Sequence, residues 1–124
     1  MIPPITEWVL KWSANGQTAA EAAELHGIFL GFLDSMVAAK RRPETIAVYS
    51  AHLWMLGQEI MAFLHASEGN RVRGVSWYFA NRMGDGVGPV PKNLKQKTEI
   101  RAYQNTCALL VKHIRLLRIA SIPR

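Results

Sequence analysis

The sequence predicts an all-α fold, a compact bundle of four to five helices in a single domain over residues 1–124. Apolar residues recur every three to four positions in several stretches, which is the spacing of one helix face. Sustained alternation of apolar and polar residues, the mark of strands, is absent from the sequence. Residues typical of helix starts and stops stand at the ends of the periodic stretches.

The first two helices are expected in the acidic half of the chain. The first should run over residues 5–14, with Asn15 and Gly16 as its left-handed cap. The second should start at Thr18, which forms a capping-box pattern with Glu21, and end in the cations of residues 40–42. Its apolar residues cover much of its girth, so we expect it to be the most buried helix. Its main stripe consists of Ala22, Leu25, Phe29, Phe32, Met36 and Ala39.

Three further helices and one loop are expected after residue 42. The third helix should begin at Pro43, a favoured first helical residue, and end at residues 67–70. A short helix is expected at about residues 75–83. The glycines and prolines that follow predict a flexible loop at about residues 84–93, which would let the neighbouring lysines move. The last helix should run over about residues 94–119, with the stripe Ile100, Tyr103, Cys107, Leu110, Ile114 and Leu117.

Charge is unevenly distributed along the chain, whose net charge is +6. Residues 1–70 carry four Lys/Arg and seven Asp/Glu, whereas residues 71–124 carry eleven Lys/Arg and two Asp/Glu. A basic half favours a polyanionic partner, most often nucleic acid, and a solvated basic face is the alternative. Charge alone does not decide between these two interpretations.

Residue patterns that carry catalysis or bind cofactors are not found. The single cysteine, Cys107, excludes an internal disulfide, fits a reducing, cytoplasmic location, and is interpreted as a small buried hydrophobe. The four histidines lack metal-ligand spacing, and the glycines of residues 84–88 lack the signature of a phosphate loop. No signal peptide is recognised, and the most apolar run, residues 28–39, is too short to span a bilayer. We expect no enzyme, metal, cofactor or membrane association.

Two local patterns have a functional and a structural interpretation. Residues 22–33 resemble a helix-turn-helix motif, with Gly27 at its turn position. Phe29 and Phe32, however, stand where polar side chains should meet base edges. Gly27 is therefore interpreted as a site of close helix packing. The four tryptophans are interpreted as core or interface aromatics. Trp77 alone has the cationic neighbourhood that stacking on bases would need.

Two segments resemble the core-binding domain of tyrosine recombinases and phage integrases. The first contains Thr45, Tyr49 and Leu53, which resemble that family's Thr-x3-Tyr-x3-Leu helix opening, and the second runs from Lys97 to Pro123. The resemblance covers roughly residues 18–123 and implies a bundle of four or five helices that grips duplex DNA as half of a clamp. It implies DNA contacts at the two helix openings, namely at Arg41, Arg42, Thr45, Lys97, Thr98 and Arg101. The family's catalytic domain has no counterpart in this sequence.

These observations predict a non-catalytic DNA-binding helical module that contacts duplex phosphates through one basic face. The alternative is a protein-interaction or self-associating helical bundle with no nucleic-acid role, which the hydrophobic share of 49% motivates. A homo-oligomer that binds DNA would satisfy both interpretations. The residues expected at the DNA interface are Arg41, Arg42, Thr45, Arg71, Arg73, Lys92, Lys95, Lys97, Thr98, Arg101, Lys112 and Arg115.

Overall fold

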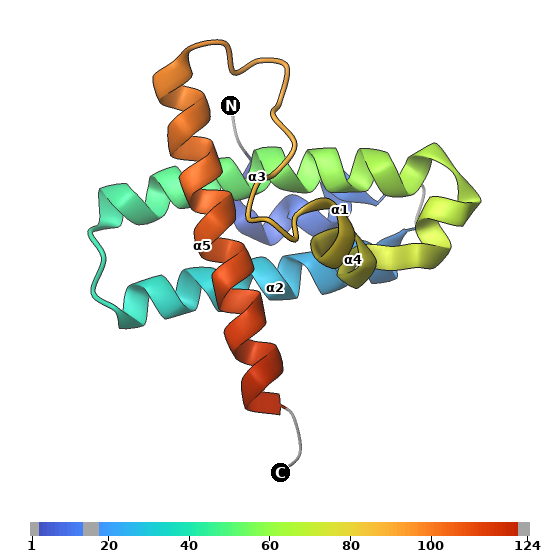
Figure 1. Cartoon of the computed structure of the whole chain (residues 1–124), viewed down its shortest axis with the longest axis horizontal. Coiled ribbons are helices and arrows are strands. Elements are labelled where there is room, and N and C mark those ends of the chain that lie inside the picture. The colour runs from blue at the N-terminus through green and yellow to red at the C-terminus, as the bar shows by residue number, and fades with distance from the viewer. Residues whose placement is uncertain (1–2, 14–17, 122–124) are drawn as a thin grey trace.

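Two long antiparallel helices form the body of the molecule, and a third long helix crosses them (Figure 1). The computed structural model describes residues 3–13 and 18–121, with side chains as far as residue 117. Every regular element in these residues is helical, which confirms the predicted all-α bundle. The elements are η1 (Ile5–Glu7), α1 (Trp8–Trp12), α2 (Ala19–Ala38), α3 (Pro43–Ala66), α4 (Glu68–Arg82) and α5 (Lys97–Ser121).

The first expected helix is a 3-10 turn followed by the short α1, and its expected cap at Asn15 and Gly16 lies outside the described residues. Helix α3 begins at Pro43, as its sequence predicts. Helix α2 was expected to be the most buried helix. Both α2 and α3 pack against α1, α4 and α5, so the two helices share the central position. None of the described helices is long and apolar enough to cross a membrane.

The core is centred on aromatic side chains from the first three helices. Trp8 and Trp12 of α1 are buried, and their rings lie 5.4 Å apart. Trp12 also stacks on Trp54 of α3 at 5.6 Å and meets the edge of Phe29 of α2 at 5.9 Å. The interpretation of Trp8 and Trp12 as core aromatics is therefore confirmed.

Close packing occurs at a different glycine from the one that the sequence suggested. Gly27 is exposed, and a Cβ built on it would meet nothing within 4 Å, so the expectation of close packing there is wrong. Gly57 of α3 is buried, and a Cβ there would lie 2.1 Å from Cζ2 of Trp12. The indole of Trp12 thus occupies the space in which a side chain at position 57 would stand.

The start of α2 differs from the expected capping box. Thr18 is the N-cap residue, but its side chain forms no capping hydrogen bond. Its Oγ1 lies instead 2.7 Å from Nε2 of His65, near the end of α3. The capping-box prediction is therefore wrong, because a partner distant in sequence takes the hydroxyl.

The end of α2 is a Schellman motif with lysine in the left-handed position. Lys40 has φ of 60°, its N–H donates to Val37 O, and the N–H of Arg41 donates to Met36 O. Helix α2 therefore ends at Ala38, before the three cations that were expected to close it. A left-handed residue with a side chain costs of order 1–3 kcal/mol.

We expect Lys40→Gly to raise the free energy of unfolding by about 1 kcal/mol, because relief of the left-handed strain exceeds the entropy that glycine adds to the unfolded chain. Chemical denaturation of the wild type and the variant measures this difference. Lys40→Ala keeps the strain and removes the charge, so its stability should stay within about 0.5 kcal/mol of the wild type. A Lys40→Gly protein no more stable than Lys40→Ala would contradict the assignment of strain.

Helix α4 contains a break at Gly74 that the sequence pattern does not predict. Ser67 ends α3 and also caps α4, since its Oγ accepts from the N–H of Asn70. Residues 67–70, expected to end a helix, therefore also start the next one. Gly74 then interrupts the helix with φ of 81° and ψ of −179°, a conformation essentially restricted to glycine. The short helix expected at residues 75–83 corresponds to the part of α4 that follows this break.

The loop between α4 and α5 is fastened to α5 at two successive residues. The side-chain amide of Gln104 accepts from Gly88 N–H and donates to Gly88 O, both at 2.8 Å. The hydroxyl of Tyr103 donates to Pro89 O at 2.7 Å. A Cβ on Gly88 would lie 2.6 Å from Sγ of Cys107, so the loop backbone lies directly against α5. Three hydrogen bonds to α5 therefore arise at residues 88 and 89 of the stretch that we expected to be flexible.

Candidate nucleic-acid interface

The expected interface residues do not form one face; they fall into groups at separate ends of the molecule. The first group, which we call the α3 arm, is residues 40–45, at the turn between α2 and α3 (Figure 1). The second, the α5 arm, is residues 92–101, which comprises the end of the long loop and the start of α5. The remaining expected residues lie at the start of α4 or in the second half of α5, namely Arg71, Arg73, Lys112 and Arg115.

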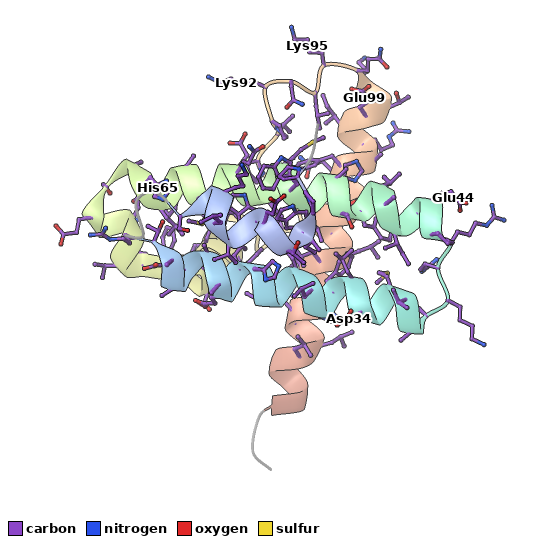
Figure 2. All side chains as sticks on the ribbon, turned by 180° about the vertical axis from the view of Figure 1, so that it is seen from behind. Asp34, Glu44, His65, Lys92, Lys95 and Glu99 are labelled. Atoms are coloured by element: carbon purple, nitrogen blue, oxygen red, sulfur yellow. The ribbon has the colours of Figure 1, made fainter. Side chains whose placement is uncertain are left out.

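Both arms are strongly basic and exposed. The α3 arm has three cations and one carboxylate, and the α5 arm has four cations and one carboxylate. The carboxylates are Glu44 and Glu99; Figure 2 shows Lys92 and Lys95 projecting from the loop close to the start of α5. Among the expected residues of the two arms, Thr45 is partly buried, and the exposed ones are Arg41, Arg42, Lys92, Lys95, Lys97, Thr98 and Arg101.

A polar contact joins α3 to α5 where the two helices cross. Nδ1 of His52 lies 2.7 Å from Oγ1 of Thr106, and Thr106 Oγ1 also donates to Ala102 O at 3.3 Å. Thr106 is 2% exposed, and the His52 ring meets the Tyr103 ring edge-on. From this contact each helix extends nine residues back to its start, Pro43 in α3 and Lys97 in α5, a length of about 14 Å. The two helix starts therefore lie equally far along their helices from this contact.

Burial lowers the pKa of His52 and of His113 below the usual 6.5. Nε2 of His113 is buried without a hydrogen-bond partner in the described structure. Its ring stands edge-on against the Phe32 ring at 5.8 Å, so α5 and α2 meet at an imidazole that is favoured in its neutral form.

We expect the free energy of unfolding to fall as the pH drops below about 6.5, the unfolded value, towards the lowered folded values of His52 and His113. In that range the unfolded chain binds more protons than the folded one, so stability increases with pH. Urea denaturation at pH 7.5 and at pH 5.5 measures the difference. A His52→Asn/His113→Leu double variant should show a smaller loss between these values; an equal loss would assign the dependence to other groups.

Arg71 and Arg73 lie at the opposite end of α3 from the α3 arm. Helix α3 has 24 residues and is therefore about 36 Å long, which separates these arginines from Arg41 and Arg42 by most of the molecule. The sequence alone could not place them, because the direction of the chain after residue 67 depends on how α4 packs.

A stack of two aromatic rings between two arginines covers this end of α3. The Arg73 guanidinium lies 4.7 Å from the centre of the Trp77 ring, and Trp77 stacks on Phe63 at 5.7 Å. Arg82 lies 5.3 Å from the centre of the Phe63 ring. Trp77 is partly buried and packs against both Arg73 and Phe63, so a base could stack on this indole only in competition with these partners. The geometry favours the structural interpretation of Trp77.

Cys107 is buried beneath the loop. Burial raises the pKa of its thiol to about 11, so the protonated form predominates at neutral pH. The interpretation of Cys107 as a small buried hydrophobe is confirmed by an exposed fraction of 1%. In the described ranges, no three His, Cys, Asp or Glu side chains are grouped so that they could hold a metal ion.

In comparisons with known proteins, no family model, curated protein or solved structure matches the chain.

Proposed function

We propose that the protein is a non-catalytic DNA-binding module that contacts duplex phosphates through the α3 arm and the α5 arm. The proposal is supported mainly by the polar contact between His52 and Thr106, since two exposed, basic helix starts lie equally far along α3 and α5 from it. It keeps the expected residues of the two arms, of which the resemblance to integrase core-binding domains implied all except Lys92 and Lys95. It leaves out Arg71, Arg73, Lys112 and Arg115.

The chemistry of the arms suits phosphate rather than base recognition. Six Lys/Arg side chains of the arms belong to the expected interface, and each can neutralise a phosphate and release a condensed counterion: Arg41, Arg42, Lys92, Lys95, Lys97 and Arg101. Lysine and arginine contacts to phosphates position a protein on a duplex but carry no direct sequence information. We therefore propose an affinity that depends strongly on salt and weakly on sequence.

We expect the logarithm of the association constant for duplex DNA to fall with the logarithm of salt concentration with a slope of about −5, which corresponds to six phosphate contacts. Fluorescence anisotropy with a labelled duplex at several salt concentrations measures this slope. The double variants Arg41→Ala/Arg42→Ala and Lys97→Ala/Arg101→Ala should each reduce its magnitude by about 2, because each removes two contacts.

The matched control is Arg71→Ala/Arg73→Ala, which removes the same charge at the far end of α3. Its slope should stay close to that of the wild type. If all three double variants reduce the magnitude of the salt-dependence slope by the same amount, binding depends on net charge alone and the two arms have no special role. Absence of binding to any duplex at low salt would reject the proposal.

Self-association is a second candidate, and exposed leucines near the end of α5 favour it. Leu116 and Leu117 are 57% and 54% exposed, although the helical stripe placed Leu117 towards the core. Helix α5 continues here past α2 towards the C-terminus (Figure 1). Sedimentation velocity of the wild type and of Leu116→Ser/Leu117→Ser tests this candidate. A wild type that is monomeric at high concentration would reject it.

A further inference from the structure

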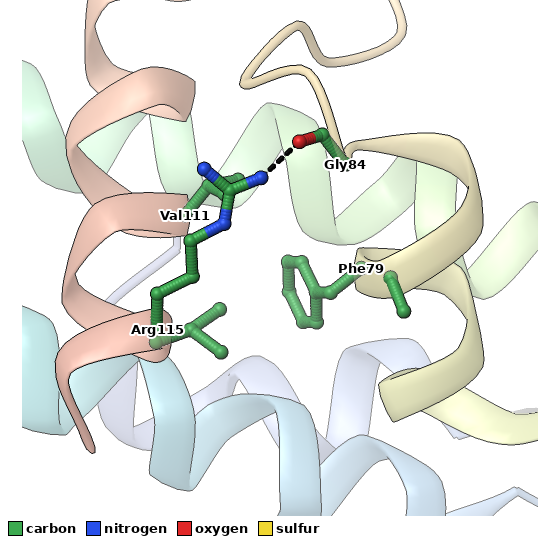
Figure 3. Close-up of a pocket in the computed structure, with 6 residues that line it drawn as sticks. Phe79, Gly84, Val111 and Arg115 are labelled. Atoms are coloured by element: carbon green, nitrogen blue, oxygen red, sulfur yellow. Dashed lines mark hydrogen bonds between the residues drawn. The ribbon is translucent and has the colours of Figure 1, made fainter. Parts of the chain in front are cut away.

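A small cavity lies between α4 and α5, away from both arms. Its volume is about 220 Å³, and its lining combines five apolar or small residues with one arginine (Figure 3). Phe79 and Val111 form its buried floor, whereas Ala80 and Gly84 are exposed at its edge. Ile114 and Arg115 complete the lining from α5.

Arg115 brings the only full charge to this lining. Its guanidinium reaches across to the end of α4 and donates from Nη2 to Gly84 O (Figure 3). A guanidinium carries five N–H donors in a planar fork. Among the described residues, Gly84 O is the hydrogen-bond acceptor of this fork, so donors remain for an anion at the cavity edge.

We propose that this cavity binds a small monocarboxylate with an aromatic or branched aliphatic body. The apolar body would fill the space against Phe79, Val111 and Ile114, and the carboxylate would accept hydrogen bonds from Arg115. A cavity of about 150 Å³ holds a benzene ring, so this one has room for a ring and a short spacer. Polyphosphates fit poorly, because the apolar walls offer no partners for further charges.

The test is a titration of the isotope-labelled full chain with phenylacetate, followed by backbone amide resonances. We expect saturable shifts concentrated at Gly84, Val111 and Arg115. Phenylacetamide, which has the same shape without the charge, should bind at least tenfold more weakly. Shifts concentrated in the α5 arm, or equal binding of the acid and the amide, would overturn the proposal.

Two variants separate the contributions of charge and of space. Arg115→Gln should remove the preference for the acid over the amide, and Ala80→Met should weaken both ligands because its side chain fills the cavity. If Arg115→Gln fails to fold, Arg115→Lys keeps the charge but loses the fork, and should bind phenylacetate several-fold more weakly than the wild type. Unchanged binding by the folded Arg115 variant would overturn the proposal. The outcome is independent of DNA binding, since the cavity and the arms share no residue.

Discussion

Replacement of Gly57 by alanine should destabilise the protein by about 3 kcal/mol, the upper range for overpacking a filled core. The added Cβ would lie 2.1 Å from Cζ2 of Trp12 and within 2.8 Å of two further indole carbons. The indole has little room to retreat, because Trp54 stacks on it and Phe29 meets it edge-on. Helix propensity alone predicts the opposite sign, a gain of about 1 kcal/mol for alanine over glycine.

The same substitution at Gly27 provides the control, because that glycine lies exposed in α2 with nothing within 4 Å of a built Cβ. Gly27→Ala should stabilise the protein by up to about 1 kcal/mol through helix propensity. Urea denaturation, with near-ultraviolet circular dichroism as a probe of the tryptophans, measures both variants. Equal stabilisation by the two substitutions would contradict the position of Trp12 against α3.

Replacement of Gly88 by alanine should cost about 2–3 kcal/mol, again through overpacking. The Cβ would lie 2.6 Å from Sγ of Cys107 and 3.4 Å from Cε of Met83. The loop backbone cannot move away without losing the two hydrogen bonds that Gln104 makes to Gly88. The expected effect therefore arises from a glycine in a loop, a position at which substitutions are usually tolerated.

A rescue experiment identifies the clash. Cys107→Ala removes Sγ and by itself should cost about 1 kcal/mol for the lost buried atom. In the double variant the new Cβ takes the place of the sulfur, so its loss should be smaller than the sum of the two single losses by 1 kcal/mol or more. Additive losses would show that Sγ is not the atom that excludes a side chain at position 88.

Local signals predicted the fold class and several helix boundaries. Pro43 marks the start of α3 because its fixed φ and missing N–H suit a first helical residue. Ser67 ends α3 as predicted, but its second role as the N-cap of α4 was not predicted, since the same residue types close one helix and open the next. The sequence around Thr18 matches a capping box, but its hydroxyl contacts His65, 47 residues away in sequence. Rules based on neighbouring residues cannot predict such a contact.

The candidate interface could be predicted only in part. The sequence identified the cations, but not which of them share an end of the molecule, because this depends on where α5 crosses α3. The residues that fix the crossing, His52 and Thr106, carry no charge pattern that would single them out. The cavity beside Arg115 could not be predicted either, because residues 79–84 and 111–115, which line it, come together only when α5 packs against α4.

The pairing of Gln104 with Gly88 has an evolutionary consequence. The glutamine side chain presents one donor and one acceptor to a single backbone residue, as a neighbouring peptide unit would in a sheet. Asparagine is one methylene shorter, and glutamate lacks the donor. In homologues of this chain, the amide at position 104 should therefore persist where position 88 is glycine, and the two positions should change together where the loop is rebuilt.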